Sequence, residues 1–298
     1  FLDPDMWAVL GDFVDDIPVT VWVHGAEIQP WHRRAFESQS DEMLERAKSQ
    51  SDARIRFWRE LLQSAPAKLR LVFVSAYLAE VAMTDLGLRL PEHQYDIIHN
   101  AIDTELFAYH PKEPEQRKRI LSIRPYASRI YANDLTVQAI LMLSEKPFFD
   151  DLEFRIIGDG RLFETTVEPL RGFNNVMIER RFLSQFEIAS IHQSYGVFLC
   201  PSRMDTQGVS RDEAMASGLV PVTTAVAAIP EFVDSSSGIL AAPEDAGALA
   251  AGIERLYMNP EEFQSLSRNA AKRVQRQSSK NRAMSQELSL LSADVESR

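Results

Sequence analysis

The sequence predicts an α/β fold built from parallel sheets, and two observations lead to this prediction. Short β-branched or apolar runs alternate with amphipathic segments along most of the chain. The apolar runs are nearly continuous, as expected for strands that are buried on both faces. Repeated strand–helix–strand order favours parallel sheets with covering helices. We expect strands at residues 19–23, 71–74, 95–98, 120–123, 154–157, 176–178, 197–200, 219–223 and 238–240.

Helical patterns lie between these strands and after the last of them. The patterns between strands include residues 136–143, 161–170, 185–193 and 209–217. Residues 31–64 are charged and lack a strand signal, which predicts one or two exposed helices with Phe57 and Trp58 on an apolar face. The chain beyond Pro243 is expected to be helical to about residue 292.

Domain boundaries are predicted from a polar connection at residues 109–119, YHPKEPEQRKR, which carries two prolines. It looks like a surface segment shortly after a boundary. We therefore expect an N-terminal domain over 1–98, a second domain over 99–280, and a C-terminal helix and tail over 281–298.

Composition excludes several function classes. The chain has 298 residues, of which 45% are apolar and 25% charged, as in a soluble globular protein. A net charge of −11 argues against a nucleic-acid or anionic-lipid partner. The single cysteine, Cys200, indicates a reducing compartment, so we expect a cytoplasmic protein. The chain starts at Phe1 and shows no signal-peptide pattern, which suggests a piece of a longer protein.

Two acids and a glycine turn give the strongest chemical signal. In Met204–Glu231, Gly208 is followed by Val209 and Ser210 and is expected to open a helix, whose free N–H groups favour an anion. Asp205 precedes this anion site and Glu213 follows it, so the two acids can bracket a nucleotide diphosphate-sugar. The alternative is that Asp205 only caps the helix and Glu213 is solvated.

Basic and aromatic residues at strand ends extend this candidate site. Arg124 ends one predicted strand and Arg129 follows five residues later, where open α/β sheets bind ligands. Gly158 belongs to a Gly-Asp-Gly turn, which is a weak signal and fits an ordinary strand-to-helix turn as well. Arg180, Arg181 and Phe182 follow another strand and are candidates for the edge of a nucleobase pocket, or plain surface residues.

His24 ends the strand in VWVHGAE, a place that faces a cleft in a doubly wound sheet. A satisfied structural histidine is the alternative. We find no His/Cys pattern typical of zinc and no Gly-x-Ser-x-Gly motif, so neither a metal site nor serine hydrolase chemistry is expected.

Seven blocks in a characteristic order carry a resemblance. They are VWVHGAE (21–27), VFVSAYL (72–78), IIHNAIDTELF (97–107), ILSIRPYASR (120–129), FRIIGDG (154–160), VFLCPSRMDTQGVSRDEAMASGLVPVTT (197–224) and IPEFV (229–233). With these blocks the chain resembles the family 4 glycosyltransferases, which are retaining enzymes of the GT-B fold. The resemblance implies two Rossmann-like, doubly wound domains that face a cleft, the N-terminal one incomplete in this chain.

The resemblance also assigns roles. It implies that Glu213 holds the nucleotide ribose, that Asp205 contacts the transferred sugar, and that Arg124 binds the diphosphate. Gly208, Val209 and Ser210 would approach the sugar and phosphates through their backbone, and His24 would lie by the reaction centre. The resemblance implies that no bound metal is needed, because arginine, lysine and the helix terminus stabilise the leaving diphosphate. It also implies that no protein nucleophile is needed, because the acceptor attacks the face from which the diphosphate leaves.

The chain departs from the family pattern at four points. Asp205 stands where the family usually has glutamate, and Ala227 and Ala228 stand where it has a glycine pair. The usual Lys-Gly after the diphosphate arginine is absent, so Arg129 or the stretch 131–134 must take its place. The N-terminal domain is also shorter than in the family.

The leading hypothesis is a retaining hexosyltransferase that moves a sugar from a UDP- or GDP-sugar to a glycan or glycoconjugate, as in surface-polysaccharide synthesis. Two alternatives remain open. One is another GT-B activity, a phosphorylase or an epimerase. The other is a non-catalytic nucleotide-sugar or glycan-binding module of a larger assembly. As a piece of a longer protein, this chain would bind nucleotide but transfer poorly.

Overall fold

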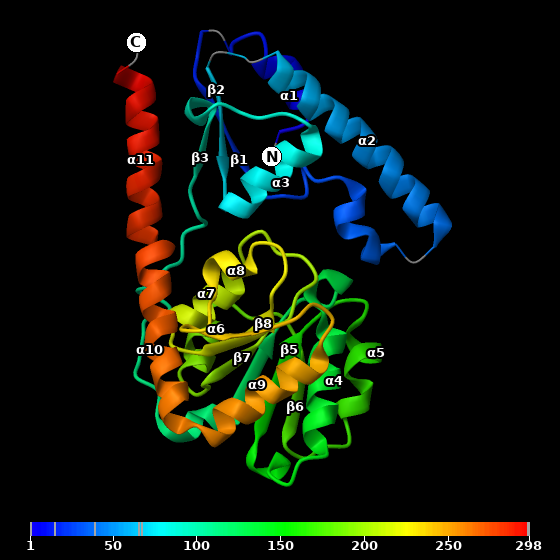
Figure 1. The fold of residues 1–298 in the computed structure, drawn as a ribbon, viewed down its shortest axis with the longest axis vertical. Coiled ribbons are helices and arrows are strands. Elements are labelled where there is room, and N and C mark those ends of the chain that lie inside the picture. The colour runs from blue at the N-terminus through cyan, green and yellow to red at the C-terminus, as the bar shows by residue number, and fades with distance from the viewer. Residues whose placement is uncertain (1, 15, 39, 65, 67, 297–298) are drawn as a thin grey trace. The chain divides into compact units, whose positions relative to one another are not determined.

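The computed structural model describes residues 2–14, 16–38, 40–64, 66 and 68–296 of the chain (Figure 1). It forms two compact units. The first unit holds the described residues up to Asn100 together with those from Ala283 onward, and the second unit is Ala101–Arg282. The segment after residue 282 is thus grouped with the first unit, whereas the sequence suggested a separate tail from residue 281.

The first unit is built on a parallel sheet with the strand order β1-β2-β3. Its strands are β1 (Val19–Val23), β2 (Leu69–Phe73) and β3 (Tyr95–Ile97). The helical segments around them are α1 (Pro4–Leu10), η1 (Trp31–Glu37), α2 (Asp41–Gln63), α3 (Ala76–Leu86), η2 (Glu92–Gln94) and α11 (Lys280–Glu296). Neither α1 nor α3 was among the helices expected from the sequence.

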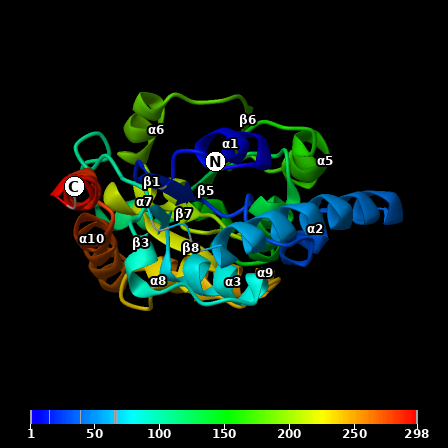
Figure 2. The same ribbon diagram turned by 90° about the horizontal axis from the view of Figure 1, so that it is seen from above.

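Helices cover both faces of this sheet because successive side chains of a strand point to opposite sides. Leu71 and Phe73 of β2 belong to one apolar cluster with residues of α2 and α3. Val72, the residue between them, packs instead with Ala283 and Leu290 of α11. Figures 1 and 2 show α2 and α11 on opposite sides of the three strands.

The helix α2 is less exposed than its sequence suggests. Its N-cap Ser40 accepts a hydrogen bond from the Met43 amide at 3.2 Å. Trp58 is completely buried, and its indole N–H donates to the Glu27 carbonyl at 2.7 Å. The expected apolar face therefore anchors the helix to the unit through a large aromatic side chain.

The second unit is built on a six-stranded parallel sheet with the order β6-β5-β4-β7-β8-β9. The strands are β4 (Arg119–Ile123), β5 (Glu153–Gly158), β6 (Val176–Arg180), β7 (Val197–Leu199), β8 (Val220–Thr224) and β9 (Ile239–Ala241). All nine predicted strands are present, with ends within two residues of the expected ones. The order reverses between β4 and β7, which are hydrogen-bonded neighbours. Such a switch point is where open α/β sheets form a ligand crevice.

Helices complete the second unit on both faces of the sheet. They are η3 (Pro114–Lys118), η4 (Arg129–Tyr131), α4 (Asn133–Ser144), η5 (Phe149–Asp151), α5 (Phe163–Val167), η6 (Glu168–Leu170), α6 (Gln185–His192), α7 (Val209–Ala216), α8 (Ile229–Phe232), α9 (Ala246–Met258) and α10 (Pro260–Gln277). Ile120 of β4 packs into the cluster that contains α4 and α9. Leu121, the next residue, packs with Ala214 of α7 on the other face.

The connection at residues 109–119 is not wholly a surface segment. Lys112 is buried, and its ammonium donates to the His192 carbonyl at 2.6 Å. Burial lowers the pKa of Lys112 to about 8, because the charged form loses water. The lysine ties this connection to the C-terminal end of α6.

Candidate active site

A pocket of about 450 Å³ opens at the carboxyl ends of the strands beside the switch point. Residues from β4, β5, the loop after β6, α6 and the start of α7 surround it. Its lining consists of Ile123, Arg124, Pro125, Tyr131, Gly158, Arg181, Phe182, Leu183, Ile188, Asp205, Gly208, Val209, Ser210 and Glu213. Eight of the residues expected at the site therefore lie together, namely Arg124, Gly158, Phe182, Asp205, Gly208, Val209, Ser210 and Glu213.

The turn before α7 brings backbone N–H groups to the pocket. Gly208 is the N-cap of α7 and has φ 95°, a left-handed conformation that favours glycine. A Cβ atom there would lie 2.6 Å from Nη1 of Arg211, so the space also excludes a side chain. The helix therefore begins at a residue without a side chain, where an anion can approach the first backbone N–H groups.

Arg124 supplies the buried positive charge of the pocket. Its side chain is buried, with Nη1 3.0 Å from the Ser210 hydroxyl and Nη2 2.7 Å from the Ser202 hydroxyl. The Tyr131 ring lies 4.8 Å from the guanidinium carbon. Among the described residues no carboxylate pairs with Arg124, and its Nε has no hydrogen-bond partner. A buried guanidinium held only by neutral groups is suited to an anionic ligand.

Glu213 is the acid in the wall of the pocket formed by α7. It is 8% exposed, and burial, aided by the nearby Asp212 carboxylate, raises the pKa of Glu213 to about 7. No group in the described part of the chain donates a hydrogen bond to its carboxylate. The solvated-helix interpretation of Glu213 is therefore wrong, and its carboxylate is available to accept hydroxyl hydrogen bonds.

Asp205 lies on the turn rather than on the helix. Its Oδ1 accepts a hydrogen bond from the Gln207 amide at 3.2 Å, and its carbonyl accepts from the Ala228 amide at 3.1 Å. The carboxylate thus caps the turn locally and also lines the pocket.

Gly158 forms the floor of the pocket at the end of β5. A Cβ atom at this position would lie 2.0 Å from the Arg124 carbonyl oxygen. Glycine is required here because two strand ends approach each other closely. The weak Gly-Asp-Gly signal therefore reflects backbone packing that shapes the pocket.

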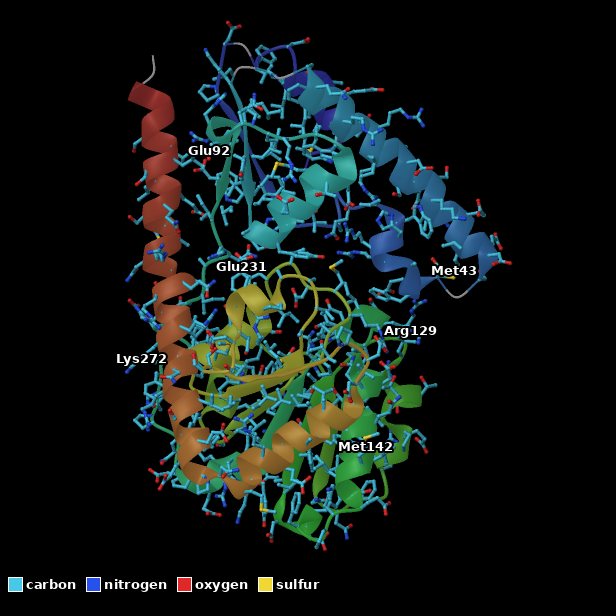
Figure 3. All side chains as sticks on the ribbon, viewed as in Figure 1. Met43, Glu92, Arg129, Met142, Glu231 and Lys272 are labelled. Carbon is cyan, nitrogen blue, oxygen red and sulfur yellow. The ribbon has the colours of Figure 1, made fainter. Side chains whose placement is uncertain are left out.

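Arginines around the pocket differ from the expectation. Arg129 is exposed in η4 and does not line the pocket, and Figure 3 shows it at the outer edge of the second unit. Arg180 points to Asp159 and Glu164, with N–O distances of 2.8 and 3.2 Å, and is also outside the lining. The two side chains lie outside the pocket for different reasons, since Arg129 belongs to the exposed η4 turn whereas Arg180, at the end of β6, is held by two carboxylates.

Tyr131 and Arg181 line the pocket instead. Arg181 pairs with Glu179 and Glu187, both at 2.9 Å, so its charge is already balanced. Tyr131 falls within the stretch 131–134 that replaces the expected Lys-Gly, and its ring covers Arg124. Sequence reasoning named this stretch without assigning the tyrosine a role.

Phe182 is 74% exposed although it lines the pocket. An aromatic ring held open to solvent beside a polar pocket offers a surface for a planar ligand group.

His24 lies in the first unit, directly after β1. It is exposed, and its backbone N–H donates to the Glu27 carboxylate. Its expected role at the reaction centre stays a prediction.

The described residues contain no group of three or more His, Cys, Asp or Glu side chains that could hold a metal ion. Within the same residues, no helix has the length and apolar character needed to cross a membrane.

Comparison with known proteins gives two sequence matches. Residues 117–259 match the sequence model of the family described as Glycosyl transferases group 1. The chain is also 28% identical over 207 residues to MMP alpha-(1->4)-mannosyltransferase of Mycolicibacterium hassiacum. This match covers 68% of the chain but 49% of the relative, so the chain spans about half the length of that protein.

Solved structures resemble the chain in fold. Sucrose-phosphate synthase of Thermosynechococcus elongatus aligns with a TM-score of 0.72 and 18% identity, over 94% of this chain and 68% of that chain. Anabaena HepE, in complex with UDP and glucose, aligns with a TM-score of 0.67 and 16% identity, over 93% of this chain and 72% of that chain. The predicted fold class, α/β of GT-B type with Rossmann-like domains, is confirmed.

Proposed function

We propose that this chain is a glycosyltransferase that takes its sugar from a nucleotide diphosphate-sugar, UDP- or GDP-linked, and passes it to a glycan or glycoconjugate acceptor. The single observation that carries the proposal is the arrangement around the start of α7. Among the described residues, the buried Arg124 guanidinium has no carboxylate partner and the buried Glu213 carboxylate has no hydrogen-bond donor, and both line one pocket with the Gly208 turn.

Each part of the pocket suits one part of such a donor. Arg124 and the first amides of α7 match the diphosphate, because both offer hydrogen-bond donors with positive charge. Glu213 suits the ribose diol, since a carboxylate accepts two hydroxyl hydrogen bonds. Asp205 suits hydroxyls of the transferred sugar, and Phe182 suits the base.

The proposed reaction takes place in the cytoplasm. The transferred sugar keeps its anomeric configuration. The bond between the sugar and the diphosphate breaks while the acceptor oxygen bonds to the same face of the sugar. Arg124 and the α7 N-terminus would stabilise the leaving diphosphate, so the proposal requires neither a resident metal nor a protein nucleophile. The similarity to a mannosyltransferase supports this class of reaction.

Calorimetric titration of the chain with UDP, GDP and ADP tests the proposal. We expect UDP or GDP to bind more tightly than ADP, and Glu213→Gln to weaken that binding by about 1–3 kcal/mol. Glu164→Gln is the matched control, because Glu164 pairs with Arg171 and Arg180 outside the pocket. Absence of binding by both UDP and GDP would refute the proposal.

One observation favours a second candidate, a donor-binding module without transfer. Apart from Arg124, the only arginine or lysine among the described lining residues is Arg181, which is already paired with two carboxylates. Of the side-chain cations described in the pocket wall, Arg124 alone would then be free to stabilise a leaving diphosphate. This candidate predicts donor binding with no release of free nucleotide, and NMR detection of released UDP or GDP from the bound donor would remove it.

A further inference from the structure

Arg211 and Asp212 form an ion pair inside the start of α7. Arg211 is 2% exposed and Asp212 is 1% exposed. Nε and Nη2 of Arg211 lie 3.1 and 2.7 Å from Oδ1 of Asp212. Burying two charges is costly, and apolar residues of similar size would often serve a helix core as well. The pair therefore calls for a role beyond packing.

Hydrogen bonds join this pair to the turn that precedes α7. Nη2 of Arg211 donates to the Gln207 carbonyl, and Nε2 of Gln207 donates to Oδ2 of Asp212 at 3.2 Å. The backbone N–H of Gln207 in turn donates to Oδ1 of Asp205 at 3.2 Å. The chain of contacts thus runs from the buried ion pair to a carboxylate that lines the pocket.

The remaining nitrogen of Arg211 lies beneath Gly208. Nη1 is buried and has no hydrogen-bond partner among the described residues. A Cβ atom on Gly208 would lie 2.6 Å from it, so the guanidinium is packed against the turn backbone. The Phe232 ring covers the guanidinium at 5.4 Å. The backbone of the turn therefore packs directly on the Arg211 guanidinium.

We propose that Arg211, held by Asp212 and Gln207, is a positioning residue that fixes the turn from Asp205 to Gly208 and so aims the Asp205 carboxylate at the sugar of the donor. This inference rests on the proposed function. It predicts a larger effect on the contacts to the sugar than on those to the nucleotide. Asp205 belongs to the turn itself, whereas Arg124 is also held by Ser202 and Glu213 lies further along α7.

The variant that tests it is Arg211→Met/Asp212→Asn. Replacing Arg211 alone would leave the Asp212 carboxylate buried and unpaired, which endangers folding. The double variant removes both charges, and its asparagine can still accept from Gln207. Ile253→Val is the control for a general loss of stability, since Ile253 is fully buried in α9 and is not a lining residue.

The first measurement is a double-mutant cycle with Asp205→Asn, using UDP-glucose and GDP-mannose as probes and UDP and GDP as references. In the native background we expect Asp205→Asn to weaken nucleotide-sugar binding about tenfold. In the Arg211→Met/Asp212→Asn background, Asp205→Asn should lower the affinity for the nucleotide-sugar less than about threefold, because the turn no longer holds residue 205 in place. Binding of UDP and GDP should change less than about threefold throughout.

The second measurement needs no ligand. Hydrogen exchange of the Gln207 amide should become at least about tenfold faster in the double variant and stay unchanged in Ile253→Val. An unchanged exchange rate would show that the Arg211–Asp212 pair does not hold the turn. Independent, additive losses in the cycle would overturn the role of Arg211 while the proposed function stands. Failure of the native chain to bind any of the four probes would instead refute the proposed function. The exchange rate would still show whether the Arg211–Asp212 pair holds the turn.

Discussion

The pH dependence of nucleotide binding follows directly from the environment of Glu213. Its pKa is raised to about 7 by burial, and its carboxylate has no hydrogen-bond donor in the described part of the chain. The ionised form offers two charged acceptor oxygens, so it binds both hydroxyls of a ribose more strongly than the protonated form does. We therefore expect affinity for the nucleoside diphosphate to rise as the pH rises through 7.

The magnitude follows from the fraction ionised. A carboxyl group with this pKa is about 9% ionised at pH 6 and about 91% ionised at pH 8, so affinity should rise about tenfold between these values. The stability of the free chain should move in the opposite direction. From about pH 4.5, the pKa of an ordinary glutamate, to about 7 the folded state binds more protons than the unfolded chain, so rising pH lowers stability.

Replacing the acid tests both effects. Glu213→Gln should abolish the tenfold pH effect on binding and should stabilise the free chain at pH 8 by up to about 3 kcal/mol. Calorimetry with UDP or GDP at pH 6, 7 and 8 measures the first effect and urea unfolding the second. The 2′,3′-dideoxy nucleotide is the control, because it keeps the titrating diphosphate but lacks the diol. An equal pH dependence for the nucleotide and its dideoxy form would refute the reasoning.

Substitutions at three other positions, two of them with a control variant, have definite expected outcomes. Arg124→Met should weaken inorganic pyrophosphate binding, measured by NMR titration, at least about tenfold, whereas Arg180→Met should leave it unchanged. Phe182→Ala should weaken UDP or GDP binding up to about tenfold in calorimetry but spare pyrophosphate, and an equal loss for both would contradict a stacking role. Ala227→Gly should raise the free energy of unfolding by up to about 1 kcal/mol, seen as a higher melting temperature, because Ala227 has φ 48°. Ala228→Gly, at φ −80°, should lower it, and the same sign for both would exclude relief of strain.

The strands and the central site residues could be predicted because their signals are local. Each buried strand is an uninterrupted apolar run, and Gly208 and Glu213 stand at fixed positions around one helix start. The strand order could not be read from these runs, because it depends on contacts distant in sequence. The pairing of β4 with β7 creates the crevice, and only the structure shows it.

The errors concern side chains whose direction depends on a turn or on burial. Arg129 was expected to bind phosphate, but the η4 turn exposes it and brings Tyr131 to the pocket instead. The sequence analysis made no prediction for Arg211 and Asp212, because the sequence alone does not show that the two charges neutralise each other inside the unit. Burial of a charged side chain depends on tertiary contacts, so a sequence pattern does not predict it.

The attachment of α11 to the first unit has a consequence for the order of folding during synthesis. The second unit is continuous in sequence, from Ala101 to Arg282. The face of β2 that carries Val72 is covered by α11 residues that leave the ribosome only after that whole unit. We expect the second unit to reach its native state first, and the first unit to be completed last although most of its residues are made earlier.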